Sequence, residues 1–151
     1  MLKLITQSCF MYRCKIHTLL SIGVVLWQSF DHPTDTLLPV MKVGLNKKTG
    51  HNGLLTSWKD EDDPRGGDFS FGVDPQRQRE VFIWRDSHPY IRYDIMIESW
   101  TNNDILSFSV DRSDEGIYVS FSVFDKSIAT RWTLSRTGAL ELLFWTAINM
   151  K

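Results

Sequence analysis

The sequence predicts an all-β protein, and three observations carry this prediction. After residue 25, short runs of aromatic and β-branched residues recur along the chain. Clusters of Gly, Pro, Asp, Asn and Ser separate these runs, as turns separate strands. Apolar and polar residues alternate along the clearest run, which is the periodicity of a strand with one buried face. The 151 residues suffice for one ordinary core or two small β modules.

The expected strands can be placed in chain order. The first is Val24–Phe30, which ends at Asp31-His32-Pro33 because proline lacks a backbone donor and restricts the residue before it. In Asp68–Val73, the two phenylalanines and the last valine alternate onto one face. Further strands are expected at Leu54–Trp58, Glu80–Trp84 and Leu106–Val110, and links at Asn46–Gly53, Lys59–Gly67 and Ser99–Asp104.

The clearest alternation lies in Gly116–Asp125, where one face is fully apolar and the other is mixed. The apolar face holds Ile117, Val119, Phe121 and Val123. Turns at Asp125–Ser127 and Ser135–Gly138 then lead into Ile128–Ser135 and Ala139–Trp145. Three consecutive antiparallel strands, a meander, are the simplest topology for this part of the chain.

Residues 1–25 do not follow these patterns. Lys3 begins the segment as in a signal peptide, but polar and charged residues interrupt the apolar region and no small-residue cleavage site follows, so a signal peptide is unconvincing. The longest apolar stretch, Leu19–Trp27, is far below the roughly 20 residues that span a bilayer, so no transmembrane span is expected. A helical periodicity is tolerated through Leu2, Ile5, Cys9, Ile16 and Leu20.

Charge and cysteine content narrow the function classes. The net charge is -1, and Lys and Arg are scattered among nearly equal numbers of Asp and Glu, so no basic stripe for nucleic acid is expected. Cys9 and Cys14 cannot build a disulfide framework and are expected as free or locally paired thiols. The four histidines show no metal-ligand spacing with the cysteines: His17, His32, His51 and His88.

Motifs for catalysis and for calcium are missing as well. The chain contains no Gly-rich phosphate loop, no His-Arg-Asp loop, no Asp-Phe-Gly triplet and no Gly-x-Ser-x-Gly elbow. The acidic run Asp60–Asp63 fails the EF-hand spacing because Pro64 stands where a ligand is needed, which favours a solvated turn. No enzyme activity, no catalytic, cofactor-binding or metal residue and no cofactor are therefore expected.

One family resemblance runs through most of the chain. The stretch LWQSFDHPTDTLL at Leu26–Leu38 resembles the segment that closes the bulb-type lectin domain of plant S-domain receptor-like kinases. Residues 49–50, 55–59, 62–64 and 67–71 are similar to the junction that follows it. Residues 73–90, 117–123 and 133–145 are similar to the S-locus glycoprotein domain, so the resemblance covers roughly residues 26–145. One departure is Tyr93–Trp100, which stands where the family usually has a Ser-Gly-Pro-Trp-Asn-Gly-like stretch.

The resemblance implies a fold and a domain plan. The expected fold is the C-terminal edge of a bulb-type lectin (β-prism) domain followed by an antiparallel S-locus glycoprotein β domain. The plan divides the chain into an unaligned segment at 1–25, a lectin remnant at 26–45 and a partial S-locus glycoprotein domain at 46–151. The chain looks like a truncated piece of the extracellular region, without the later modules and the kinase.

The function implied by the resemblance is a non-catalytic extracellular recognition module. In the family, such modules perceive ligands or take part in recognition of pollen. An extracellular peptide or protein ligand and self-association are the implied partners, and the implied location is extracellular or at the cell surface. Two alternatives stay open: a non-functional or decoy fragment of a receptor-like kinase gene, and a carbohydrate-binding lectin.

The sequence predicts no ligand-binding residue, and the groups that could contact a ligand have other interpretations. The family's mannose motif, Gln-x-Asp-x-Asn-x-Val-x-Tyr, is absent, and Gln28 and Asp31 are interpreted as residues of a strand-end turn. Aromatic residues at alternating positions are interpreted as core, as in Phe69/Phe71 and Trp132/Leu134. Solvated surface is the interpretation of four arginines: Arg79, Arg85, Arg92 and Arg112. The chain has no Asn-x-Ser/Thr sequon.

Overall fold

The computed structural model describes residues 2–9, 14–22, 24–77, 80–94, 106–125 and 127–146. In these residues the chain forms β-strands and one short 3-10 helix, η2 (Ser29–Asp31), without an α-helix. The all-β prediction is therefore confirmed. The expected turn at Ser99–Asp104 lies outside the described residues.

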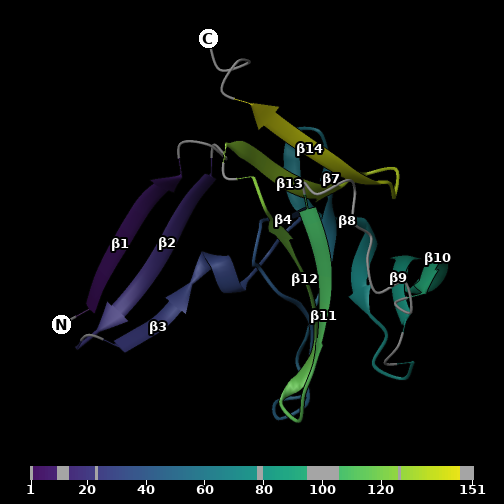
Figure 1. The fold of residues 1–151 in the computed structure, drawn as a ribbon, viewed down its shortest axis with the longest axis horizontal. Helices are drawn as coiled ribbons and strands as arrows, with labels where there is room; N and C mark the ends of the chain where they lie inside the picture. The colour runs from purple at the N-terminus through teal and green to yellow at the C-terminus, as the bar shows by residue number, and fades with distance from the viewer. Residues whose placement is uncertain are drawn as a thin grey trace.

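The described strands form four antiparallel sheets (Figure 1). The N-terminal sheet has the order β1 (Leu2–Cys9), β2 (Cys14–Ser21), β3 (Val24–Gln28). The second has the order β10 (His88–Asp94), β9 (Glu80–Arg85), β8 (Asp63–Val73), β7 (Leu55–Asp60). The third has the order β11 (Leu106–Arg112), β12 (Gly116–Val123), β5 (Val43–Asn46), β6 (Asn52–Gly53). The fourth has the order β14 (Leu140–Thr146), β13 (Ile128–Leu134), β4 (Thr36–Leu37).

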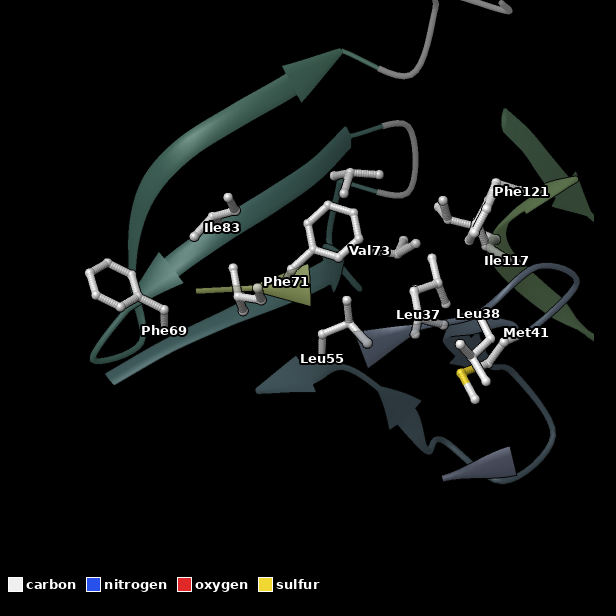
Figure 2. Close-up of a cluster of buried hydrophobic side chains, with 14 residues drawn as sticks. Leu37, Leu38, Met41, Leu55, Phe69, Phe71, Val73, Ile83, Ile117 and Phe121 are labelled. Carbon is white, nitrogen blue, oxygen red and sulfur yellow. The ribbon is translucent and has the colours of Figure 1, made fainter. Parts of the chain in front are cut away.

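A single hydrophobic core joins the second, third and fourth sheets. Each sheet turns the apolar side of its period-2 pattern inward, so side chains from all three meet. Figure 2 shows Leu37 lying between Leu55 and Ile117, which come from three different sheets. Phe121 and Val43 are fully buried in the same cluster. Burial of each such side chain stabilises the fold by about 1.5–3 kcal/mol.

The N-terminal sheet lies to one side of the other three in Figure 1. The helical periodicity suggested for residues 1–25 is wrong, because β1 and β2 form an antiparallel hairpin whose register runs from Leu2 opposite Ser21 to Cys9 opposite Cys14. Pairing with a neighbouring strand satisfies the backbone groups that a helix would have satisfied internally. The apolar pattern of residues 1–25 is weak at both the helical and the strand period. It was therefore compatible with a helix and with strands.

The expected meander of three strands is wrong in its first pairing, whereas its second, between Ile128–Ser135 and Ala139–Trp145, is confirmed by the antiparallel pairing of β13 with β14. β12 pairs with β11 on one side and with β5 on the other, whereas β13 pairs with β14 and β4. Both edges of β12 are thus occupied, and no edge remains for β13. The chain leaves one sheet after Val123 and enters another at Ile128.

Three further expectations differ from the structure. The link at Lys59–Gly67 is shorter than expected, because β7 runs on to Asp60 and β8 begins at Asp63, which makes the acidic run a hairpin turn. β10 was not expected, and it pairs with β9 across a turn at Asp86–Ser87. β4 and β5 were not expected either. Their pairing is long-range: Val43 lies opposite Val119, and Leu37 lies opposite Trp132.

The strands β4 and β5 are relevant to the expected domain boundary between residues 45 and 46. β5 runs through this position and is a central strand of the third sheet. Residues 36–46 therefore share their sheets and core with residues of the expected S-locus glycoprotein domain, 46–151. The assignment of 26–45 and 46–151 to two domain families stays a prediction.

Candidate recognition surface

The two residues weighed for a sugar site lie on different elements. Gln28 is the last residue of β3 and is half-buried, while Asp31 is exposed at the end of η2. A sugar grip of the lectin type needs polar side chains spaced along one strand. The change from strand to 3-10 helix between these residues does not provide that arrangement. Their interpretation as strand-end residues agrees with this placement.

Two residues of the acidic run Asp60–Asp63 accept hydrogen bonds from arginine side chains at the surface. Arg136 Nη1 donates to Asp60 Oδ1 at 2.9 Å, and Arg65 Nη2 donates to Asp63 Oδ2 at 2.6 Å. The hydrogen bonds from the Arg65 side chain and backbone lower the pKa of Asp63 below 3.8. Among the described residues, no cluster of three or more His, Cys, Asp and Glu side chains is arranged to hold a metal ion.

The aromatic side chains at alternating positions belong to the core, as predicted. Phe69, Phe71 and Leu134 are buried in the main cluster, and Trp132 packs against it with its ring 5.2 Å from that of Phe108. These rings are therefore not available as a stacking platform for a ligand. The sequence signal that identified them was the period-2 alternation.

The arginines that were interpreted as solvated surface are exposed wherever the structure describes them. Arg85 is exposed, with its guanidinium 5.6 Å from the ring centre of Phe69. Arg92 is exposed and pairs with Glu80 at 3.5 Å. Arg112 is exposed at the end of β11. Arg79 lies outside the described residues.

The most unusual surface is the apolar strand β3 with the turn before it. The exposed fractions are 90% for Ile22, 62% for Val24, 52% for Val25 and 55% for Leu26. Contact with water is unfavourable for these four apolar side chains, which lie close together in the sequence. Exposed apolar patches of this kind mark interaction sites in soluble proteins. We call these four residues the β3 patch.

The strand β3 was expected from the sequence, but its neighbour in the sheet was not. The expected range was Val24–Phe30, and the structure ends the strand at Gln28. No strand was expected at residues 14–21, although these residues form β2. Residues Thr18–Ser21 of β2 pair with β3. Within the described residues, β3 has a hydrogen-bonded neighbour on this side alone. Its other edge presents unpaired backbone donors and acceptors.

Comparisons with known proteins show which sequences this part of the chain resembles. The sequence model of the D-mannose binding lectin family matches residues 17–59, which include β3 and most of β2. A receptor-like serine/threonine-protein kinase of Arabidopsis thaliana is 40% identical over 129 residues, which is 80% of this chain and 15% of the kinase. Two S-locus-specific glycoproteins, of Brassica oleracea var. alboglabra and Brassica oleracea, are 38% and 40% identical over 80% of this chain and 29% of their own length.

The fold and these matches define an all-β chain that is similar in sequence to proteins of the lectin and S-locus class. Over 80% or more of its length, the chain is similar to S-locus glycoproteins and G-type lectin S-receptor-like kinases. It spans between 15% and 29% of the length of these curated relatives. The part of the chain that the structure describes contains no helix long and apolar enough to cross a membrane.

Proposed function

We propose that this chain acts as a non-catalytic, extracellular recognition module and that the β3 patch is its contact surface. The observation that carries the proposal is the exposure of Val24, Val25 and Leu26, each more than half exposed on an edge strand. The similarity to S-locus glycoproteins and receptor-like kinases supports the extracellular location and the recognition role. By the same family analogy, the recognition is that of a peptide or protein, as in pollen recognition.

The chemistry of the surface defines what it would recognise. The free edge of β3 offers a row of backbone N–H and C=O groups to an added strand. Its described side chains from Val24 to Leu26 are apolar and would be covered by the side chains of that strand. The partner is therefore an extended, mainly apolar peptide segment. Charged segments would lose hydration without gaining an opposite charge.

A peptide-display experiment tests the proposal. Random peptides displayed on phage are selected on immobilised chain, and the selected clones are then assayed on the Val25→Lys variant. We expect apolar, extended sequences that bind the wild type and lose binding to the variant. Val40→Lys is the matched control, because Val40 is a similarly exposed valine outside the patch, at 63%. Failure to enrich any sequence, or equal binding to Val25→Lys, overturns the proposal.

A further inference from the structure

We propose that Asn52 is a site of spontaneous covalent modification, at which the backbone nitrogen of Gly53 attacks the side-chain amide. The fold restrains this reaction, and opening of the short strand β6 releases it. The inference does not depend on the β3 patch or on the proposed function. It is carried by the sequence at Asn52, by the hydrogen bond from Asn52 to β8, and by the space around Gly53.

The pair Asn52-Gly53 combines the two residue types that favour this reaction. It is the single place in the sequence where glycine follows asparagine. Glycine has no Cβ atom, so its backbone nitrogen can approach the preceding side chain without steric hindrance. Asparagine is one of the thermolabile residues of proteins. The sequence therefore places a reactive amide next to its least hindered nucleophile.

The reaction balances with water as its only co-reactant. The Gly53 nitrogen loses its proton and forms a bond to Cγ of Asn52, while the side-chain nitrogen takes up a proton and leaves as ammonia. Water then opens the five-membered imide at either of its two carbonyl carbons. The products are aspartate and isoaspartate, and no electrons enter or leave the chain.

The folded structure holds the Asn52 side chain in an unreactive arrangement. Its Nδ2 donates to the backbone oxygen of Val73 at 3.0 Å, and this bond joins β6 of the third sheet to β8 of the second. Its Oδ1 is buried, and no donor among the described residues reaches it. This oxygen must take up negative charge as the ring closes, and the folded site offers that charge no stabilisation.

Only a few contacts hold β6 in its sheet. The strand has two residues, it lies at the edge of the third sheet, and β5 is its one neighbour among the described strands. In that pairing Leu45 lies opposite Asn52 and Gly44 lies opposite Gly53. Local opening of such a segment costs less free energy than unfolding of the core strands. Opening breaks the bond to Val73 and lets the Asn52 backbone rotate, so the Gly53 nitrogen can reach Cγ.

Modification of Asn52 would oppose the closure of β6. An aspartate at this position has no Nδ2 to donate to the oxygen of Val73, so two acceptors would face each other. Burial of its charge without a donor is also unfavourable. In isoaspartate the backbone runs through the side-chain carbon, which lengthens the strand by one atom and disturbs its pairing with β5. The reaction therefore leaves a permanent mark of β6 opening.

Peptide mapping by mass spectrometry tests the site and its restraint. The full chain is incubated in mildly alkaline buffer, either folded or in urea, and asparagine, aspartate and isoaspartate at position 52 are followed with time. We expect modification in urea and a rate at least about tenfold lower in the folded chain, because opening must precede the reaction. Asn46, which is followed by Lys47, should react far more slowly than Asn52 in urea.

Three variants separate the mechanism from its consequence. Gly53→Ala should slow the reaction in urea at least about tenfold, since a methyl group hinders the attacking nitrogen. It fits the fold, because a Cβ atom on Gly53 would meet nothing closer than 3.7 Å. Asn52→Asp should lower the urea midpoint of unfolding. Asn46→Asp is its control, because Asn46 Oδ1 accepts hydrogen bonds from the backbone nitrogens of Lys48 and Thr49, which a carboxylate also accepts.

Each result decides one part of the proposal. Absence of modification at Asn52 in urea overturns the site, and an undiminished rate in Gly53→Ala overturns attack by the Gly53 nitrogen. Equal rates in the folded chain and in urea overturn the restraint by the fold. Equal midpoints for Asn52→Asp and Asn46→Asp overturn the effect on β6, whereas failure of Asn52→Asp alone to fold supports it. Binding of displayed peptides tests the proposed function separately.

Discussion

The backbone of Gly138 lies against the ring of Phe69, and this contact joins the β13–β14 turn to the β10–β7 sheet. A Cβ atom built on Gly138 would lie 2.5 Å from Cε1 and 2.6 Å from Cδ1 of Phe69. The residue also has a φ of +80°, in the left-handed region that favours glycine. On its other sides, the Phe69 ring contacts Tyr90, at 5.4 Å between ring centres, and the guanidinium of Arg85.

Replacement of Gly138 by alanine should destabilise the protein by about 2–4 kcal/mol, since left-handed strain and overpacking add. Urea unfolding followed by tryptophan fluorescence measures this loss. Gly50→Ala is the matched control, because Gly50 has a φ of +72° but would meet nothing within 4 Å. It should cost about 1 kcal/mol. Equal losses in the two variants would show that the Phe69 contact is not important.

Phe121→Ala should destabilise the protein by about 3–5 kcal/mol, because Phe121 is fully buried and packs on Phe108, with 5.9 Å between ring centres. Phe124→Ala provides the comparison on the same segment. Phe124 is 61% exposed, and its loss should change stability by no more than about 0.5 kcal/mol. The midpoint of urea unfolding checks both values. Similar midpoints for the two variants would contradict the burial of Phe121 in the core.

The Asp63–Arg65 pair should be visible in an acid titration. The side-chain hydrogen bonds from Arg65 lower the pKa of Asp63 below 3.8. A lowered folded-state pKa means that the pair stabilises the fold at pH values above the unfolded-state pKa and loses this effect as the pH falls through the lowered value. NMR titration of the Asp63 carboxyl carbon should show this shift.

Arg65→Gln should return the pKa of Asp63 toward 3.8. Lys59→Gln is the control, because Lys59 contributes only the last of the causes that lower this pKa. Its effect should be smaller than that of Arg65→Gln. A pKa of Asp63 that does not respond to Arg65→Gln would refute the hydrogen-bonded pair.

The chain should not bind mannosides specifically, although part of it matches the D-mannose binding lectin family. The polar strand motif of the family is absent from the sequence, and Gln28 and Asp31 lie on different elements. Calorimetric titration with methyl α-mannoside should give no saturable heat up to millimolar sugar. Saturable binding that disappears in Gln28→Ala would show that these residues form a sugar site.

Much of the local structure could be predicted from the sequence. The period-2 alternation in Gly116–Asp125 and Asp68–Val73 predicted strands, and the structure buries Val119, Phe121 and Phe71 on the expected face. The patch strand was also expected, since Val24–Phe30 is an apolar run ended by a proline turn. The alternation did not indicate which strands pair with one another.

Partner choice explains the errors. β12 and β13 are adjacent in the sequence and looked like a hairpin, but β5 and β11 occupy both edges of β12. No strand was expected in residues 1–25 ahead of β3, but β2 forms there and pairs with one edge of β3. In each case, a segment with a weak pattern of its own decided the outcome. Such segments become strands when their backbone groups find an open edge.

The sequence by itself determined the all-β class, the buried face of the main strands, the lack of catalytic motifs and the family resemblance. These are local properties, because side-chain alternation and motif spacing involve residues that are neighbours in the chain. The tertiary structure alone decided which strands share a sheet, that Gly138 contacts Phe69, and that β3 has a neighbour on one edge alone among the described strands. Hydrogen-bond pairing and close packing join residues that are far apart in sequence, and each edge accepts only one neighbour, so these features depend on the whole fold.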